Sequence, residues 1–206
     1  MRAMTLRNSR VLSEENPPYV VAEVNTSHSG NMDAAKGMIA KAKEVGCDCV
    51  KFQSWTPETL YSTSFYDNNP VSRRIFQKFS FSDRELSEAA VFCQQADIGF
   101  SSTPYSRAEV DFLAYRSNAP FIKVASMDLN NYAYLDYIAR TGVPMVLSTG
   151  MGDMDEMNPE RPDIDVIASL DDSNFGAAAL GRFGQFTPED GGGEFRAVNR
   201  AFQPRP

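Results

Sequence analysis

Residues 19–54 read YVVAEVNTSHSGNMDAAKGMIAKAKEVGCDCVKFQS, and this stretch predicts a β-strand, a helix and a second β-strand in succession. The apolar runs at 19–24 and 48–54 are short and end in polar residues, as expected of parallel strands buried on both faces. Gly46 is placed to end the helix between them. The face of that helix predicted to be buried comprises Ala35, Met38, Ile39, Ala42 and Val45.

The same alternation continues along the chain. The remaining candidate strands are residues 98–103, 120–126 and 144–149. Capping boxes, in which Ser and Glu satisfy each other's backbone N–H groups, are predicted at Ser82–Glu85 and Ser106–Glu109. A fourth helix buries Leu135, Ile138 and Ala139 and stops at Gly142. Strand–helix repetition predicts an α/β fold with five parallel strands, and the pattern fits either a closed barrel or an open sheet.

The longest connection, residues 55–81, is rich in aromatic residues. A connection of this length is either a functional lid or a packing patch. We favour packing.

The pattern fails near residue 157. Pro159 and Pro162 interrupt the next helical stretch, because proline lacks the N–H donor that a helix interior needs. The residues that follow contain no lysine and include the run GGG at 191–193. We therefore expect two regions: a barrel-like part over 1–157 and a divergent, poorly ordered tail over 158–206. Only 163–170 is expected to form a strand or short helix there.

The composition excludes several classes of protein. A formal net charge of −7 argues against surfaces that bind nucleic acid or anionic membranes, since both need clustered Lys and Arg. The apolar runs are too short to span a bilayer. Three cysteines, two of them at Cys47 and Cys49, make neither a disulfide framework nor a zinc site, which favours the reducing cytoplasm. The sequence has neither a dinucleotide-binding fingerprint nor a phosphate-binding P-loop.

Charged and hydroxyl side chains fall at the predicted strand ends. Glu23 ends the first strand, and Lys51 and Lys123 lie in the second and fourth. The third and fifth strands end in SST at 101–103 and STG at 148–150. Because the carboxyl ends of parallel strands face one rim, these groups predict a site for an anionic, phosphate-bearing substrate.

The structural alternative for the two lysines is that each forms an ion pair with Glu23 or Asp128. For either lysine alone, the ion pair and the substrate site are equally supported. A lysine on each of two alternate strands favours a site, because buried charges are costly. Gln53 and Ser126 are weaker candidates on the same rim. His28 is the only histidine, and a lone histidine in a loop is more often a hydrogen-bonding group than a metal ligand.

Four blocks together resemble the N-acetylneuraminate (sialic acid) synthase family: VAEVNTSHSGNMDAAKGMIAKAKEVGCDCVKFQ, SSTPYSRAEVDFL, IKVASMDLNN and VPMVLSTGM. They occur in the family's order and cover about residues 18–157. The resemblance implies a (β/α)8 TIM-type barrel. It also implies a transferase of sialic acid biosynthesis that condenses phosphoenolpyruvate with an N-acyl-mannosamine-type sugar, using Mn or Mg.

The resemblance also implies roles for single residues. The positions that match phosphoenolpyruvate contacts are Lys51, Thr103, Lys123, Ser126 and Ser148. Glu23 matches the carboxylate near the sugar and the metal-bound water, so Glu23 and Lys51 are the catalytic candidates. Two positions depart from the family: Ser27, where Asn is common, and Asp128, where Glu is frequent.

The chain is also shorter than the family pattern. About five βα units are predicted, and a complete barrel takes about 250 residues. The family's metal-binding histidines lie on later strands, and no histidine follows His28. We therefore expect a truncated barrel with unpaired edges at its first and fifth strands, which favours association with another chain, including a second copy.

Two further interpretations stay open. One is an inactive synthase fragment that retains at most phosphoenolpyruvate binding. The other is an unrelated α/β phosphate-binding enzyme, which would require the four blocks to be coincidental.

Overall fold

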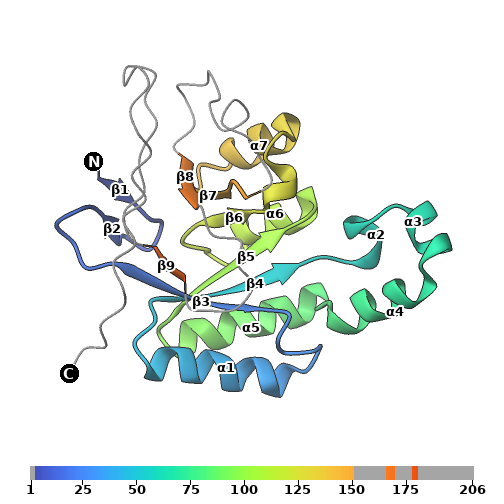
Figure 1. Cartoon of the computed structure of the whole chain (residues 1–206). Coiled ribbons are helices and arrows are strands. Elements are labelled where there is room, and N and C mark those ends of the chain that lie inside the picture. Colours follow the sequence, from blue (N-terminus) through green and yellow to red (C-terminus); the bar gives the residue numbers. More distant parts are fainter. Residues whose placement is uncertain (1–2, 151–165, 170–177, 181–206) are drawn as a thin grey trace.

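The computed structural model describes residues 3–150, 166–169 and 178–180 (Figure 1). The strands are β1 Met4–Thr5, β2 Val11–Leu12, β3 Tyr19–Asn25, β4 Cys49–Ser54, β5 Gly99–Pro104, β6 Ile122–Val124, β7 Met145–Ser148, β8 Val166–Ser169 and β9 Ala178–Leu180. The helices are α1 Met32–Glu44, α2 Pro57–Leu60, α3 Thr63–Asn68, α4 Pro70–Phe79, α5 Asp83–Gln95, α6 Arg107–Tyr115 and α7 Tyr132–Ala139, with a 3-10 turn, η1, at Ser126–Asp128. No helix in these ranges is both long and apolar enough to cross a membrane.

Two sheets carry the predicted strands. One has the order β5-β4-β3-β9 and the other β6-β7-β8. The predicted parallel pairing is confirmed for β3 with β4, β4 with β5 and β6 with β7. Between β5 and β6 the ladder is interrupted, although Ser101 Oγ of β5 donates a 2.8 Å hydrogen bond to the Phe121 carbonyl just before β6. The architecture is therefore α/β.

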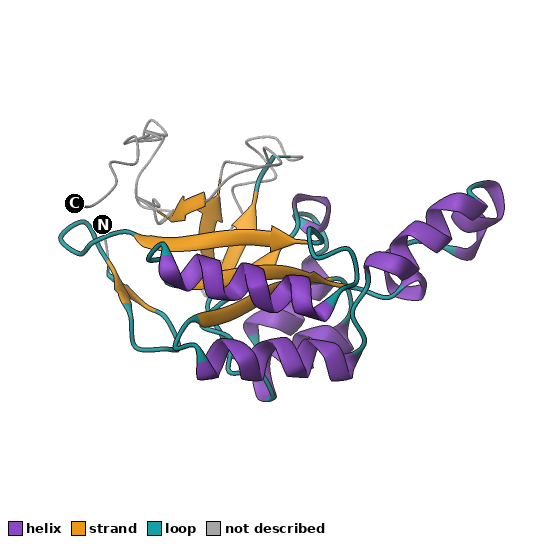
Figure 2. Ribbon diagram, turned by 90° about the horizontal axis from the view of Figure 1, so that it is seen from below, coloured by secondary structure: helices purple, strands orange, loops and turns teal. Residues whose placement is uncertain are grey.

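Helices cover the outer face of the sheets (Figure 2). In Figure 2, α1 and α5 lie side by side against the β3–β5 sheet. The core between these layers includes Ile39, Val50, Phe52 and Ala89, all of them fully buried. Helix α1 ends one residue earlier than predicted, because Val45 is its C-cap and is 62% exposed rather than buried.

The prediction of unpaired sheet edges is wrong. β9 pairs with β3 in antiparallel fashion, and β8 pairs with β7 in parallel. Backbone N–H and C=O groups at a sheet edge pair readily with any extended segment, whatever its side chains. β8 lies within the predicted 163–170 element, whereas β9 falls where we expected no regular structure. The rest of the expected tail lies outside the described residues, so the division at 157 stays a proposal.

Two local predictions also need correction. The fourth strand ends at Val124, and Ser126 begins the turn η1, because the sequence SMDLNN is rich in turn-forming Asp and Asn.

The capping box at Ser82 is confirmed. At Ser106 only half of the box forms, since the Glu109 carboxylate accepts the Tyr105 N–H at 2.7 Å and the Thr59 hydroxyl at 3.2 Å instead.

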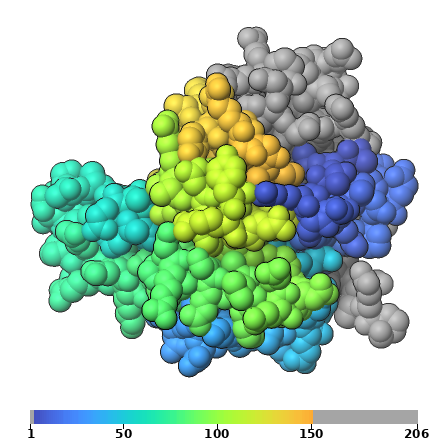
Figure 3. Space-filling view, turned by 180° about the vertical axis from the view of Figure 1, so that it is seen from behind, coloured from blue at the N-terminus to red at the C-terminus, as the bar shows by residue number. Residues whose placement is uncertain are grey.

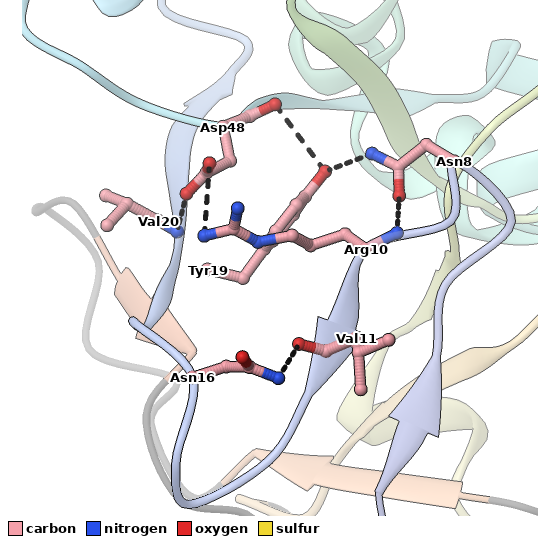
Figure 4. Close-up of polar contacts among 7 residues, drawn as sticks. All are labelled: Asn8, Arg10, Val11, Asn16, Tyr19, Val20 and Asp48. Atoms are coloured by element: carbon pink, nitrogen blue, oxygen red, sulfur yellow. Dashed lines mark hydrogen bonds and ion pairs between the residues drawn. The ribbon is translucent and has the colours of Figure 1, made fainter.

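The hairpin β1–β2 packs against the amino-terminal ends of the strands (Figure 4). Tyr19 Oη accepts a hydrogen bond from Asn8 Nδ2 at 3.1 Å, and Asp48 accepts the Val20 N–H at 2.7 Å. The hairpin also contacts segments much farther along the chain. The Arg7 guanidinium donates to the Ala114 carbonyl, and the Arg7 backbone N–H donates to Pro120 O at 3.1 Å. A second small core forms under the hairpin from Leu6, Tyr19, Val21, Cys49, Phe121 and Val146.

The aromatic-rich connection forms α2, α3 and α4, which project from the body as an arm (Figure 3). Within the arm Tyr61 stacks on Phe65 at 4.4 Å between ring centroids, and Tyr61 lies 5.4 Å from Phe76. Trp55 links the arm to the body through an edge-to-face contact with Phe76. The aromatic residues of this connection thus pack mainly on one another, and the choice between a lid and a packing patch stays a prediction.

Candidate active site

An ion pair between buried Lys51 and partly exposed Glu23 joins β4 to β3. Glu23 and Lys51 are register partners in the parallel ladder. Lys51 Nζ lies 2.8 Å from Glu23 Oε2 and donates to Thr103 Oγ1 of β5 at 3.2 Å. Lys51 is only 5% exposed, although it is the sole charged residue of its strand. Three neighbouring strands thus hold one ammonium group in a fixed position.

A second lysine and a hydroxyl meet on the other sheet. Lys123 of β6 donates through Nζ to Ser148 Oγ of β7 and to the Val124 carbonyl. Both residues are buried, with Lys123 at 9% exposure. The structure therefore brings Glu23, Lys51 and Thr103 into one cluster, and Lys123 with Ser148 into another.

The two weaker candidates lie near these clusters in sequence but have other neighbours. Gln53 Nε2 donates to Tyr105 Oη at 3.4 Å, just beyond the end of β5. Ser126 opens the turn after β6. In that turn burial raises the pKa of Asp128, while a hydrogen bond from Asn131 lowers it. Tyr105 was not among the residues predicted from the sequence. Its position directly after the predicted strand end at 101–103 and Pro104 could have indicated that it lies near the site.

His28 has a scaffolding role in the loop that follows β3. Its ring is 1% exposed and stacks on Phe81 with 3.9 Å between centroids. Its Nδ1 accepts the Gly30 N–H at 3.1 Å. Burial lowers the pKa of the imidazole, and a hydrogen bond with the Asn25 backbone opposes that shift. This agrees with the interpretation of a loop histidine that forms hydrogen bonds.

The pKa of His28 predicts acid destabilisation. Below the ordinary value of 6.5 the unfolded chain takes up a proton that the folded protein still resists, so folding stability falls as the pH falls. We expect the melting temperature of the wild type to drop more steeply between about pH 7 and pH 5 than that of His28→Phe. Thermal unfolding followed by circular dichroism measures both.

The comparison isolates the effect of His28. The raised pKa values of Glu109 and Asp128 make folding stability rise as the pH falls, and they do so in both proteins. Parallel pH profiles for the wild type and His28→Phe would contradict the prediction.

The described residues do not offer a metal site. They contain no group of three or more His, Cys, Asp and Glu residues placed to hold an ion. His28 is stacked on Phe81 with Nδ1 already accepting a hydrogen bond, so its ring is not presented as a ligand. The donor set therefore does not fit the Mn or Mg that the sequence resemblance implies.

Comparison with protein families matches residues 38–169 to the NeuB family, which covers most of the chain. The chain belongs to the NeuB family. This confirms the resemblance to sialic acid synthases. The NeuB match includes the second half of α1, the arm, both lysines and β8, whereas Glu23 lies before its first residue.

Similar proteins agree with membership of the NeuB family. The N-acetylneuraminate-9-phosphate synthase of Mus musculus is 35% identical over 156 residues, covering 72% of this chain and 43% of the relative. The N,N'-diacetyllegionaminic acid synthase of Legionella pneumophila is 30% identical over 148 residues, covering 68% and 41%. The chain thus spans less than half the length of these curated NeuB relatives.

A solved structure supports the fold. The N-acetylneuraminic acid synthetase of Leptospira borgpetersenii superposes with a TM-score of 0.67 at 24% identity, covering 76% of this chain and 52% of that one. At this identity the likeness concerns the fold alone.

Proposed function

We propose that this chain carries the phosphoenolpyruvate-binding part of a nonulosonic acid synthase, which condenses phosphoenolpyruvate with an N-acyl-mannosamine-type sugar. The observation that carries the proposal is the buried Lys51, fixed by Glu23 and Thr103 at the carboxyl ends of β3–β5. An ammonium group that is already desolvated and oriented binds an anion at a low reorganisation cost. Membership of the NeuB family supports the same substrate class.

Each cluster has a role in anion binding. Lys51 and Lys123 neutralise the charges of the phosphate and carboxylate groups. Hydroxyl groups add directional hydrogen bonds, and the residues proposed to supply these and other polar contacts are Gln53, Thr103, Ser126 and Ser148. Lys51 and Lys123 are both buried, so their charges act in a medium of low polarity, where electrostatic attraction is stronger than in water.

The proposed reaction forms a carbon–carbon bond and releases phosphate. C3 of phosphoenolpyruvate attacks the aldehyde carbon of the open-chain sugar, water adds at C2, and the C2–O bond to phosphate breaks. Glu23 lies beside Lys51 with its side chain partly exposed, and it accepts the proton that the water loses. The aldehyde oxygen takes up a proton in the same turnover. No step is assigned to a metal, because the described residues do not form a site for one.

The second candidate function is binding without turnover. The chain contains one histidine, and that residue is stacked within the loop after β3. This observation favours a chain that retains phosphoenolpyruvate binding alone.

Two measurements on the 206-residue chain distinguish these functions. Isothermal titration with phosphoenolpyruvate is expected to show binding that Lys123→Ala weakens by about tenfold or more, since hydrogen bonds to charged groups have that effect on affinity. Lys36→Ala is the matched control, because Lys36 is paired with Glu88 at the surface and carries the same charge. Phosphate release with N-acetylmannosamine and Mn²⁺ is the second measurement.

Phosphate release that requires the sugar supports the synthase, whereas binding without release supports the second candidate. A chain that shows no phosphoenolpyruvate binding, or one in which Lys123→Ala and Lys36→Ala behave alike, contradicts both.

A further inference from the structure

Tyr105, the residue directly after β5, lies on the same side of the sheet as the Lys51–Thr103 contact. Side chains two residues apart on a strand point to one face, and register partners on neighbouring strands share that face. Lys51 and Gln53 of β4 are two residues apart, and Gln53 is the register partner of Thr103. Gln53 Nε2 donates to Tyr105 Oη at 3.4 Å, while Lys51 Nζ reaches Thr103 at 3.2 Å. A series of side-chain contacts on one face thus leads from the buried ammonium to Tyr105.

This face of the sheet becomes more accessible toward the carboxyl end of β4. Cys49, at the start of the strand, is 0% exposed, and Lys51 is 5% exposed. Gln53 is the one residue of β4 that is not buried, and Tyr105 is partly exposed as well. Because a strand rises about 3.3 Å per residue, Gln53 lies about 7 Å beyond Lys51 along the strand. A ligand that enters from the carboxyl ends can therefore reach Gln53 and Tyr105 before it reaches the lysine.

The peptide group between Pro104 and Tyr105 is held from both sides. Its carbonyl accepts a hydrogen bond from Tyr134 Oη of α7 at 2.9 Å, and its N–H donates to Glu109 Oε2 of α6 at 2.7 Å. Both partners are buried, and burial raises the pKa of the Glu109 carboxyl. The two hydrogen bonds fix the plane of this peptide and hence the direction in which the Tyr105 side chain leaves the backbone. A side chain that is fixed in advance binds a ligand at a lower entropic cost.

The chemistry of Tyr105 differs from that of the two lysine clusters. The lysines match the anionic groups of phosphoenolpyruvate, whereas Tyr105 offers an uncharged hydroxyl group and an aromatic ring. Such a ring packs against the apolar C–H face of a sugar while its hydroxyl group forms hydrogen bonds. The hydrogen bond from Gln53, at 3.4 Å, is longer than the usual range of about 2.7–3.2 Å, so a sugar hydroxyl group can replace it at a small cost.

The order of the two substrates follows from the reaction. The aldehyde carbon of the sugar has to approach C3 of phosphoenolpyruvate, so the sugar lies on the accessible side of an anion that is held by the lysines. That is the side on which Tyr105 lies. We propose that Tyr105 binds the sugar substrate, with its ring packed against the sugar and its hydroxyl group hydrogen-bonded to it. This inference rests on the proposed function and extends it to a residue that selects the second substrate.

The test separates the hydroxyl group of Tyr105 from its ring. Tyr105→Phe removes only the hydroxyl group, and Tyr105→Leu removes the ring as well. The matched controls are Tyr115→Phe and Tyr115→Leu, because Tyr115 ends α6 and is 68% exposed. Isothermal titrations with N-acetylmannosamine, with and without saturating phosphoenolpyruvate, and with phosphoenolpyruvate alone, are made on the 206-residue wild type and the four variants. Circular dichroism verifies that each variant is folded.

Tyr105→Phe is expected to weaken N-acetylmannosamine binding by about three- to tenfold, the effect of losing one hydrogen bond between uncharged groups. Tyr105→Leu should weaken it further, because the packing of the ring is lost too. Phosphoenolpyruvate affinity should change by no more than about twofold in either variant, since the lysine clusters stay intact. Both Tyr115 variants should match the wild type for both ligands.

Three results would each overturn the inference alone: unchanged sugar affinity in either Tyr105 variant, equal losses for both ligands, and a wild type that binds phosphoenolpyruvate but no sugar. A wild type that binds sugar in a Tyr105-dependent way but no phosphoenolpyruvate would overturn only the proposed function. A wild type that binds neither ligand would overturn both.

Discussion

Replacing Lys51 by methionine is expected to weaken phosphoenolpyruvate binding by about 10- to 100-fold, because each hydrogen bond to a charged group contributes about 1.5–3 kcal/mol. Methionine keeps most of the side-chain volume of Lys51 within the packed strand end, so the change removes charge rather than packing. The substitution also leaves Glu23 without the ammonium that lies 2.8 Å away. Titration calorimetry measures the loss directly.

The matched control for this experiment is Lys36→Met, which removes a surface lysine paired with Glu88. Circular dichroism at the titration temperature verifies that Lys51→Met remains folded, since breaking a buried pair destabilises the native state. If Lys51→Met retained wild-type affinity, the anion site would have to be sought away from β4.

The largest effect on stability is expected from Phe52→Ala. Phe52 is fully buried beside Lys51, with its ring 5.5 Å from that of Phe100 and 5.8 Å from that of His28. Truncating such a side chain costs about 3–5 kcal/mol through lost burial and the cavity left behind. This is a large part of the stability of an ordinary domain, about 5–15 kcal/mol. Urea unfolding gives the change in the free energy of unfolding.

Tyr115→Ala is the aromatic control for this measurement, because Tyr115 ends α6 and is 68% exposed. We expect its effect to stay within about 0.5 kcal/mol. Similar losses for Phe52→Ala and Tyr115→Ala would show that the β3–β5 core does not govern stability.

The features predicted well from the sequence are those that depend on local pattern. Apolar runs bounded by polar residues located β3, β4, β5 and β7 to within one or two residues. Charge in an otherwise apolar strand identified Lys51 and Lys123, since such charges stand out against a buried background. The direction of strand pairing followed from the helices between the strands, which force parallel connections.

The features missed depend on contacts between distant segments. Glu109 was expected to complete a helix cap, but α2 brings Thr59 within reach of its carboxylate. The pairing of β9 with β3 joins the backbone of residues 178–180 to that of 19–21, and the sequence around 178–180 carries no strand pattern that predicts it.

The N-terminal hairpin imposes an order of events during synthesis. Arg7 emerges from the ribosome early, yet its partner Ala114 is 107 residues farther along the chain. At a translation rate of about 5–20 residues per second, the hairpin waits roughly 5 to 20 s before its docking surface exists. The hairpin is therefore synthesised well before the surface on which it docks, and β3 and β4 pair before the hairpin can cover their amino-terminal ends.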